Sequence, residues 1–351
     1  MTGHPFVRRM AICACQGELV RIVVTGGVGF IGRHVVQLLR DTGHDVLVVD
    51  SAEPLRAAPD RMVADVRARD RMDVALRGAD AVCNLAAKVG LGVDTADLPD
   101  YADRNVHGTA VLLAAMANAG VARLVLASSM VVYGEGLATC REHGTAAPPP
   151  RLEADLRAGA FEPRCRHCRS PLEPALVPEQ TPLDPRNGYA ASKAAQEYFA
   201  ASWARETAGR AVALRYHNVY GPGMPRNTPY AGVAAIFASA LRDGLAPRVF
   251  EDGGQRRDFI HVRDVAAATV AALDVERGGF VALNVGSGTP RTVGDLATAA
   301  ADVIGGPVPQ ITGEFRLGDV RHITADSSRA RRELDWCPQV DFRTGVAELV
   351  R

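Results

Sequence analysis

The sequence predicts an α/β protein in which a doubly wound parallel sheet carries a smaller second lobe and a cysteine-rich insertion. An apolar run at 21–24 leads through a glycine-rich turn into an amphipathic helix. Further short apolar runs alternate with helical segments, which is typical of parallel strands joined by helices. A proline-rich stretch with paired cysteines and histidines at 140–168 interrupts this alternation.

Composition excludes several classes of function. The chain has 351 residues, a formal net charge of +0 and a sequence pI near 7.1. Because no basic run is interleaved with aromatic residues, we expect neither nucleic acid nor an anionic membrane surface as a partner. No apolar run has membrane-spanning length, and the stretch at 10–15 is too short for a secretory signal, so we expect a cytoplasmic protein. Residues 1–18 lack periodicity and predict a flexible extension.

The first strand and the turn after it predict a binding site for a dinucleotide pyrophosphate. Gly26 permits the tight turn, Gly29 lets the backbone approach a pyrophosphate, and Gly32 lets the helix pack closely on the strand. The helix N-terminus then faces the anion with its free N–H groups. Phe30 and Ile31 lie in the same turn and are further predicted cofactor contacts.

Acidic residues after the second and third strands extend this site. The second strand, 45–49, ends in Asp50, where a carboxylate accepts hydrogen bonds from an adenosine ribose and favours NAD over NADP. The third strand-like segment ends at 63–66, where Asp65 and Val66 are expected to meet the adenine. The alternative for Asp65 is a capping role within its own loop.

The fourth strand, 81–85, runs into a segment that must pass close to the cofactor. This segment consists of Leu85, Ala86 and Ala87. Lys88 follows, and it either reaches a phosphate or the nicotinamide ribose or lies on the surface as an ordinary lysine. Asn105 opens a long apolar helix that is expected to run to Asn118, and it is a further predicted cofactor contact.

A tyrosine and a lysine four residues apart form the predicted catalytic centre. In a helix Tyr189 and Lys193 share a face, so both address one reacting oxygen. The phenol acts as acid or base, and the ammonium lowers the pKa of the phenol by favouring phenolate. The chain contains two lysines among 40 basic residues, which suggests that Lys193 meets a need for a compact ammonium. Taken singly, such a pair also occurs on solvated helix faces.

The fifth strand, 124–127, delivers two serines to the carboxyl end of the sheet, where α/β sheets bind ligands. Ser128 is a predicted cofactor contact. Ser129 is expected to hold the substrate hydroxyl that Tyr189 deprotonates, and its alternative role is to cap the strand end.

Seven segments together carry a resemblance to a known family. They are TGGVGFIG at 25–32, NVHGT at 105–109, SSMVVYG at 128–134, YAASK at 189–193, LRYHNVYGPG at 214–223, RDFIHVRDV at 257–265 and GDVRHITADSSRARRELDW at 318–336. With them the chain resembles the extended short-chain dehydrogenase/reductases, in their nucleotide-sugar epimerase/dehydratase branch. The resemblance implies a Rossmann-type sheet that binds NAD. It also implies that Ser129, Tyr189 and Lys193 are catalytic, and Tyr189 and Lys193 are expected to contact the cofactor as well.

The resemblance also implies contacts to the diphosphate of a sugar nucleotide. Asn218, Arg257 and Arg321 match positions that hold it in relatives, and arginine suits the task because it pairs bidentately with phosphate. Surface salt bridges are the alternative for either arginine. His217 stands where the family pattern usually has phenylalanine. The predicted substrate-binding residues are Lys88, Ser129, Asn218, Arg257 and Arg321.

The segment 139–178 predicts a zinc-ribbon-like insertion. It contains CREH at 140–143 and CRHC at 165–168, two knuckles whose ligands are three residues apart. Three sulfurs and one nitrogen close a tetrahedral shell, which marks a structural zinc. The expected ligands are Cys140, His143, Cys165 and Cys168, and the alternative is a set of reduced thiols without a metal. The segment has few large apolar residues and could hardly order itself without a metal.

With this insertion the chain resembles the dTDP-L-rhamnose 4-epimerases and their sugar-nucleotide relatives, which usually carry a second cysteine in place of His143. The resemblance implies an NAD-dependent 4-epimerase of a dTDP- or UDP-hexose that acts through a 4-keto intermediate. A 4-keto-6-deoxyhexose nucleotide reductase is the alternative. The apolar run at 130–132 disfavours a 4,6-dehydratase, which needs an acidic pair there. A non-catalytic NAD-binding protein is disfavoured because all three catalytic residues are present.

The predicted domain organisation follows from these segments. We expect the NAD-binding Rossmann domain at 19–217, with the insertion inside it, and a return to this domain at 257–287. The substrate-binding lobe is expected from two parts, 218–256 and 288–351. The predicted partners are a nucleotide-diphosphate sugar and a second copy of the chain, packed through the helices that start near Asn105 and Tyr189.

Overall fold

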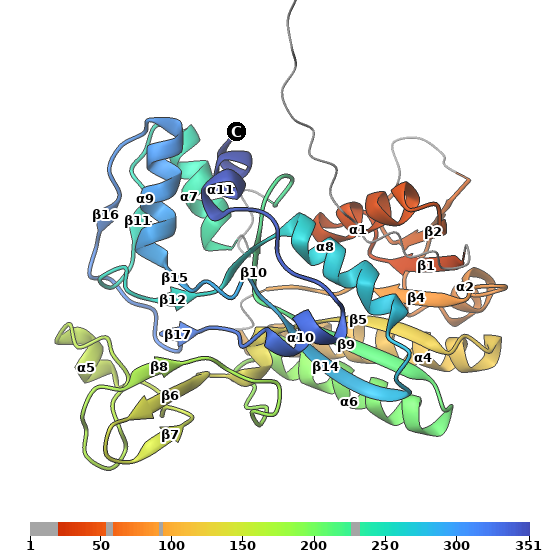
Figure 1. The fold of residues 1–351 in the computed structure, drawn as a ribbon, viewed down its shortest axis with the longest axis horizontal. Helices are drawn as coiled ribbons and strands as arrows, with labels where there is room; N and C mark the ends of the chain where they lie inside the picture. Colours follow the sequence, from red (N-terminus) through yellow and green to blue (C-terminus); the bar gives the residue numbers. More distant parts are fainter. Residues whose placement is uncertain (1–19, 54–58, 91–93, 226–231) are drawn as a thin grey trace, which may run out of the picture.

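The computed structural model describes residues 20–53, 59–90, 94–225 and 232–351. The expected extension at 1–18 lies outside the described residues. A seven-stranded sheet forms the centre of the molecule, and every neighbouring pair of its strands is parallel (Figure 1). Its strands, in spatial order, are β14 (Gly279–Val285), β9 (Arg210–Tyr216), β5 (Arg123–Ser129), β4 (Ala81–Asn84), β1 (Arg21–Thr25), β2 (Asp45–Asp50) and β3 (Arg61–Val63).

This strand order confirms the predicted doubly wound sheet. Sequence order runs outward from β1 in both directions, so the winding reverses between β1 and β4. In such sheets the crevice outside the carboxyl ends of the strands at this reversal is the usual ligand site. The strand residues are apolar on both faces because helices cover both sides of a parallel sheet.

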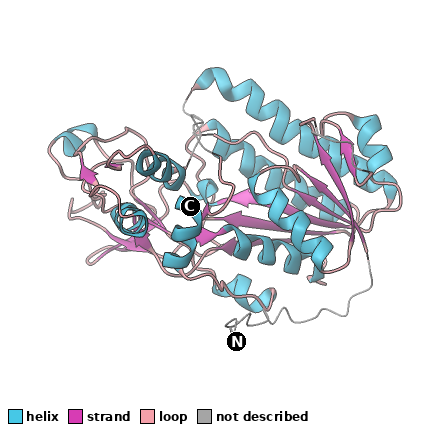
Figure 2. Ribbon diagram, turned by 90° about the horizontal axis from the view of Figure 1, so that it is seen from above, coloured by secondary structure: helices cyan, strands magenta, loops and turns pink. Residues whose placement is uncertain are grey.

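The helices divide between the two faces of the sheet (Figures 1 and 2). One face carries α1 (Phe30–Asp41), α8 (Val262–Ala271) and α10 (Ser328–Glu333), whose apolar residues share one core cluster with the strands. The other face carries α2 (Arg69–Ala75), α4 (Gly108–Ala119) and α6 (Gly188–Glu206) around a second cluster. In α1, Val35, Val36 and Leu39 repeat at helical spacing and are buried on the sheet.

The helix expected to open at Asn105 begins earlier. A 3₁₀ turn, η1 (Thr95–Asp97), leads into α3 (Leu98–Tyr101) and a π-helix, η2 (Ala102–His107), before α4. Asn105 therefore lies inside a π-helical stretch, a conformation that occurs often at functional sites.

A second lobe packs beside the carboxyl ends of the sheet strands. Its helices α7 (Val233–Arg242), α9 (Val293–Ile304) and α11 (Phe342–Val350) enclose a separate core cluster. Short paired strands complete it, namely β10 (Asn218–Tyr220) with β13 (Phe259–His261), β11 (Arg248–Val249) with β16 (Gln310–Ile311), and β12 (Arg256–Arg257) between β15 (Arg291–Thr292) and β17 (His322–Ile323). The segment around α10 differs from the expected division, because Leu334 and Trp336 pack in the core of the main sheet.

The insertion forms a small unit of its own, at the lower left in Figure 1. Three antiparallel strands in the order β7 (Gly144–Ala146), β6 (Leu137–Cys140) and β8 (Glu173–Ala175) make its sheet, and α5 (Glu153–Arg157) lies beside them. It follows the 3₁₀ turn η3 (Met130–Tyr133) after β5. Its last residues rejoin the fold at a bridge between Val177 and Ala325. Within the described ranges, no helix is long and apolar enough to cross a membrane.

Candidate active site and metal centre

A cavity of about 220 Å³ opens at the carboxyl ends of β5 and β9, beside the glycine-rich turn and below α7 of the second lobe. Ser129 and Tyr189 both line it, together with Ile31 of the turn. Two strands, one turn and one helix that are distant in sequence thus meet at one space. The expected juxtaposition of the serine and the tyrosine is present in the fold.

Tyr189 owes its position to the start of α6. Asn187 caps this helix, since its side chain accepts a hydrogen bond from the N–H of Ala190 at 2.8 Å. Tyr189 follows in the first turn, with its ring 5.9 Å from that of Tyr101. Burial raises the pKa of Tyr189 to about 12, and a hydrogen bond with Ser129 opposes this rise.

Lys193 is buried one turn further along α6. Its Nζ donates to the carbonyl oxygen of Ala127 at 2.9 Å, and it is 3% exposed. Burial lowers the pKa of Lys193 to about 8, while the carboxylate of Glu197 opposes this shift. The effect of Lys193 on the phenol of Tyr189 stays a prediction, because in this structure burial governs the pKa of Tyr189 and the ammonium of Lys193 donates to a backbone carbonyl.

A buried polar network supports these side chains, and the sequence did not predict it. Arg215 of β9 donates to both carboxylate oxygens of Glu197, at 2.9 and 2.7 Å. Arg215 also donates to the phenol oxygen of Tyr133 at 2.7 Å, and that phenol donates to Asn284. The hydroxyl of Ser128 donates to Glu197 as well, so this predicted cofactor contact faces the network. In the sequence, only the four-residue spacing of Glu197 from Lys193 on one helix indicates a contact of this network.

The glycine-rich turn has the geometry that a dinucleotide requires. Gly26 has a φ of +69°, and a Cβ there would lie 2.6 Å from the nitrogen of Ala86. A Cβ on Gly32 would lie 2.2 Å from the oxygen of Gly26. Gly29 forms the N-cap of α1, and no side chain of the described residues caps this helix, which leaves N–H groups for an anion. These residues fit a bound NAD pyrophosphate.

The acidic residues predicted to bind the cofactor have protein partners. The carboxylate of Asp50 accepts hydrogen bonds from the N–H groups of Val28 and Ala52, each at 3.0 Å, and so holds the glycine-rich turn. The carboxylate of Asp65 accepts from Arg67, which lowers the pKa of Asp65. For Asp65 this geometry favours the loop-capping alternative. Val66 packs against the core on that side of the sheet.

Asn105 serves the loop after β4 rather than an open site. Its Oδ1 accepts from the N–H of Lys88 at 2.7 Å, and its Nδ2 donates to the carbonyl of Lys88 and to the hydroxyl of Ser192. These bonds tie the segment of Leu85, Ala86 and Ala87 to α6. Lys88 itself pairs with Asp97 and Asp100, each at 2.7 Å, which differs from the predicted substrate contact. The partners of Asn105 and Lys88 lie nine or more residues away, so no short sequence pattern predicts these contacts.

The residues expected at the diphosphate divide into two groups. The Oδ1 of Asn218 is buried without a hydrogen-bond partner among the described residues. Arg257 donates to the backbone carbonyls of Arg256, Val320 and Arg321, and desolvation lowers the pKa of Arg257 to about 10. It remains a cation at neutral pH. Arg257 can therefore pair with an anionic ligand group, and the Oδ1 of Asn218 can accept a hydrogen bond from a donor of the ligand.

Arg321 differs from this expectation. It is 1% exposed, and all three guanidinium nitrogens donate to carboxylates, those of Glu162, Glu251 and Asp252. Glu162 belongs to the insertion and also bonds to the ring of His322 at 2.7 Å. Because its donors are all used by carboxylates of the insertion and of the second lobe, Arg321 links these two parts in this structure.

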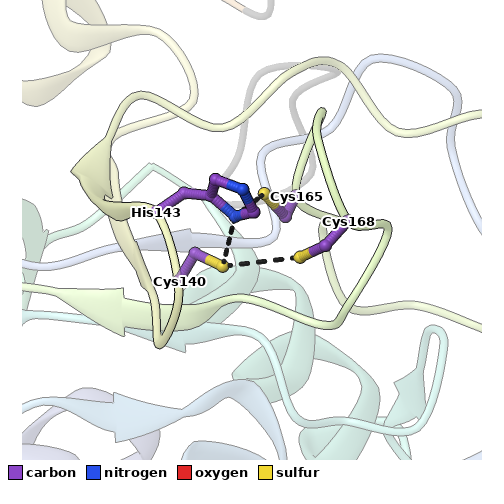
Figure 3. A group of neighbouring side chains, drawn as sticks. All are labelled: Cys140, His143, Cys165 and Cys168. Atoms are coloured by element: carbon purple, nitrogen blue, oxygen red, sulfur yellow. Dashed lines mark hydrogen bonds between the residues drawn. The ribbon is translucent and has the colours of Figure 1, made fainter.

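The four predicted metal ligands converge at one point (Figure 3). Their ligand atoms all lie within 4.8 Å of one another. The sulfur of Cys140 is 3.5 Å from Nδ1 of His143 and 3.6 Å from the sulfur of Cys168, and the sulfur of Cys165 is 3.6 Å from Nδ1 of His143. A tetrahedron with Zn–S bonds of about 2.3 Å has edges of about 3.8 Å, so the spacing fits zinc.

Each knuckle closes with a residue of positive φ. Gly144 after the first knuckle has a φ of +76°, and Arg169 after the second has a φ of +62°. Backbone N–H groups of Cys168 and His167 point at the sulfur of Cys165 and lower the pKa of Cys165 to about 7, which favours the thiolate that binds metal. The apolar core of this unit consists of little more than Ala138, Leu172 and the cysteines. A metal would supply the cohesion that so small a core lacks.

Comparison with known proteins identifies the family. The NAD dependent epimerase/dehydratase family matches residues 22–154 and 170–286. The chain therefore belongs to this family, among the extended short-chain dehydrogenase/reductases that the sequence motifs indicated. The gap in the match, 155–169, falls in the insertion.

Individual relatives cover nearly the whole chain. The chain is 33% identical to the dTDP-L-rhamnose 4-epimerase of Burkholderia thailandensis, over 94% of this chain and 93% of that protein. It is 32% identical to the UDP-glucose 4-epimerase of Mycolicibacterium smegmatis, over 94% of this chain and 97% of that protein. Among solved structures, the UDP-glucose 4-epimerase from Stenotrophomonas maltophila, with bound NAD and formylated UDP-arabinopyranose, has a TM-score of 0.77 and 29% identity, and the match covers 94% and 97% of the two chains.

Proposed function

We propose that this protein is an NAD-dependent nucleotide-sugar 4-epimerase that acts on a dTDP- or UDP-hexose through a 4-keto intermediate. One observation carries the proposal, namely that Ser129 and Tyr189 line a single cavity next to the glycine-rich turn. The similarity to both a dTDP-L-rhamnose and a UDP-glucose 4-epimerase supports the reaction class and leaves the base open.

In this proposal each side chain has a separate task. Tyr189 removes the proton of the C4 hydroxyl and later returns it, and the hydroxyl of Ser129 stabilises that oxygen. Bound NAD supplies a reversible acceptor for the C4 hydride. Because burial raises the pKa of Tyr189 to about 12, the phenol needs a nearby positive charge to act as a base, and Lys193 is the side chain suited to this. Recovery of the hydride on the other face inverts C4.

The diphosphate is assigned to Asn218 and Arg257. The guanidinium of Arg257 donates to backbone carbonyls, and a phosphate would add a charged partner to it. Arg321 would join them only by exchanging a carboxylate for a phosphate, because its donors are already used. Asp50, at the end of β2, supports NAD over NADP.

The test uses the protein as purified, without added cofactor. It is incubated with dTDP-L-rhamnose and with UDP-glucose, while proton NMR follows the sugar and absorbance follows NADH. The proposal predicts the C4 epimer without net NADH. Consumption of NADH or NADPH by a 4-keto sugar nucleotide, with no epimer formed from either substrate, would make the protein a reductase and refute the proposal.

We further propose that the insertion holds a structural zinc and braces the second lobe. Three contacts support this role. Arg151 donates to Glu251 at 2.8 Å and to the carbonyl of Asp319, and Glu162 pairs with Arg321. Glu162 precedes the proposed ligand Cys165 by three residues, so a metal that orders the segment around Cys165 also positions Glu162 for its contact with Arg321.

The last proposed feature is a homodimer formed through α4 and α6. On α6, Tyr198 is 65% exposed and Phe199 is 45% exposed, which leaves two aromatic side chains for a partner. Sedimentation velocity tests this proposal. A dimer that becomes a monomer in the Y198E/F199E variant is expected, and an unchanged mass would contradict the assigned surface.

A further inference from the structure

His217 is a buried residue at the proposed reaction site whose imidazole has no hydrogen-bond partner among the described residues. It follows the last residue of β9, and its backbone N–H donates to the carbonyl of Val285 at 3.1 Å, which anchors it beside the sheet. The residue is 4% exposed. Neither ring nitrogen has a hydrogen-bond partner among the described residues. Buried polar groups are nearly always paired, so this side chain calls for an explanation.

The cavity that His217 lines is the one shared by Ser129 and Tyr189. Its remaining wall near α7 is apolar, with Val233 and Phe259 among the lining residues. An apolar side chain in place of His217 would match this wall and would leave no buried polar atom unpaired at that position. The imidazole therefore offers hydrogen-bonding groups to a space that a ligand can enter.

The ionic state of His217 defines what such a ligand must be. Burial lowers the pKa of His217 to about 4, and the nearby carboxylate of Asp258 opposes this shift only in part. Asp258 is itself occupied, since it accepts hydrogen bonds from Ser287 and Gly288. At neutral pH the ring is uncharged and has one donor and one acceptor nitrogen. A sugar hydroxyl can satisfy either nitrogen, because it both donates and accepts.

We propose that His217 is a specificity-determining residue that hydrogen-bonds a hydroxyl of the hexose next to the reacting carbon. This inference rests on the proposed function, which puts the hexose in the cavity with Tyr189. The unpartnered ring selects sugars that carry a hydroxyl at that position, because a substrate without it leaves the buried imidazole unpaired. A site built to bond a hydroxyl rejects the analogue that lacks it.

The test compares wild type with H217F and H217N. H217F keeps a planar ring but removes both nitrogens, whereas H217N keeps one donor and one acceptor. We expect kcat/KM for the nucleotide sugar to fall about 10- to 100-fold in H217F and less in H217N. We also expect H217F to keep or raise the melting temperature, because it removes unpaired buried polar atoms. A merely structural histidine would lose stability instead.

Two further measurements separate the possible failures. The first is bound NAD, released by denaturation and quantified by absorbance, which should be equal in wild type and H217F. A parallel loss of NAD and turnover would overturn the inference, because the ring would then contact the nicotinamide amide. The second is the excess stabilisation by UDP-glucose over UDP in a thermal shift assay, which H217F should abolish.

The controls keep the two proposals distinct. If wild type converts a nucleotide sugar and H217F does so equally well, the role of His217 is refuted while the proposed function stands. If wild type converts none of the sugars and UDP-glucose stabilises it no more than UDP, both proposals are refuted. V233A, which alters the apolar wall of the same cavity without touching a polar atom, shows the effect of changed shape alone.

Discussion

Removing Arg215 should destabilise the protein strongly, because it leaves the carboxylate of Glu197 buried without its hydrogen-bonded counter-charge. The side chains of the pair are 6% and 3% exposed, and two hydrogen bonds of 2.9 and 2.7 Å join them. Breaking a buried ion pair by deleting one partner costs about 3–5 kcal/mol. With an unfolding entropy of about 2.1 cal/mol/K per residue over 351 residues, R215M should lower the melting temperature by about 4–7 °C.

The assay is scanning calorimetry of wild type, R215M, E197L and the double variant. Removing both charges leaves no unpaired ion, so the double variant should recover at least half of the loss seen in R215M. R157M is the matched control. Its ion pair with Glu153 has side-chain exposures of 72% and 48%, and exposed pairs contribute about 0–1 kcal/mol. Equal loss in R215M and R157M, or additive losses in the double variant, would refute the reasoning.

Three further predictions concern catalysis and the metal. Y189F should lower kcat by about 10²–10⁴-fold while the bound NAD measured after denaturation stays unchanged, and loss of NAD instead would point to misfolding. Burial lowers the pKa of Lys193 to about 8, so a requirement for its ammonium predicts that kcat/KM falls as the pH rises through about 8. In E197Q, which removes the carboxylate that raises this pKa, the fall should begin at lower pH, and an unshifted profile would contradict the assignment. C168S should lose the zinc measured by mass spectrometry, and its KM should rise because the insertion no longer holds the second lobe. C337S, at an exposed cysteine, should keep the zinc content and the KM of the wild type.

Local spacing explains which sequence predictions agree with the structure. The strand, glycine turn and helix at 21–41 depend on contacts between near neighbours, and the structure has them as β1 and α1. Both metal knuckles join ligands three residues apart, and the two come together as expected. The strand β14, whose apolar run is typical of a buried strand, lies in the main sheet within the range 257–287 that was predicted to return to it.

Other assignments differ from the contacts in this structure, because those contacts depend on partners far along the chain. Arg321 has the right chemistry for a phosphate, but Glu162 and Glu251 occupy its donors. Lys88 has two aspartates as partners, and α10 packs on the main sheet instead of the second lobe. In each case the residue type allowed more than one contact, and a partner distant in sequence determines which contact forms.

The sequence by itself determined the family, the parallel sheet with its dinucleotide turn, the candidate catalytic residues and the candidate metal ligands, because these follow from short-range patterns. The tertiary structure alone decided which polar groups are paired and which are free. It buried the Glu197–Arg215 pair under the site, used up the donors of Arg321 and left the imidazole of His217 without a partner in the described part of the chain, in the cavity that Tyr189 also lines. Hydrogen bonds and burial join residues that only the folded chain brings together, and they set the charge and availability of each group.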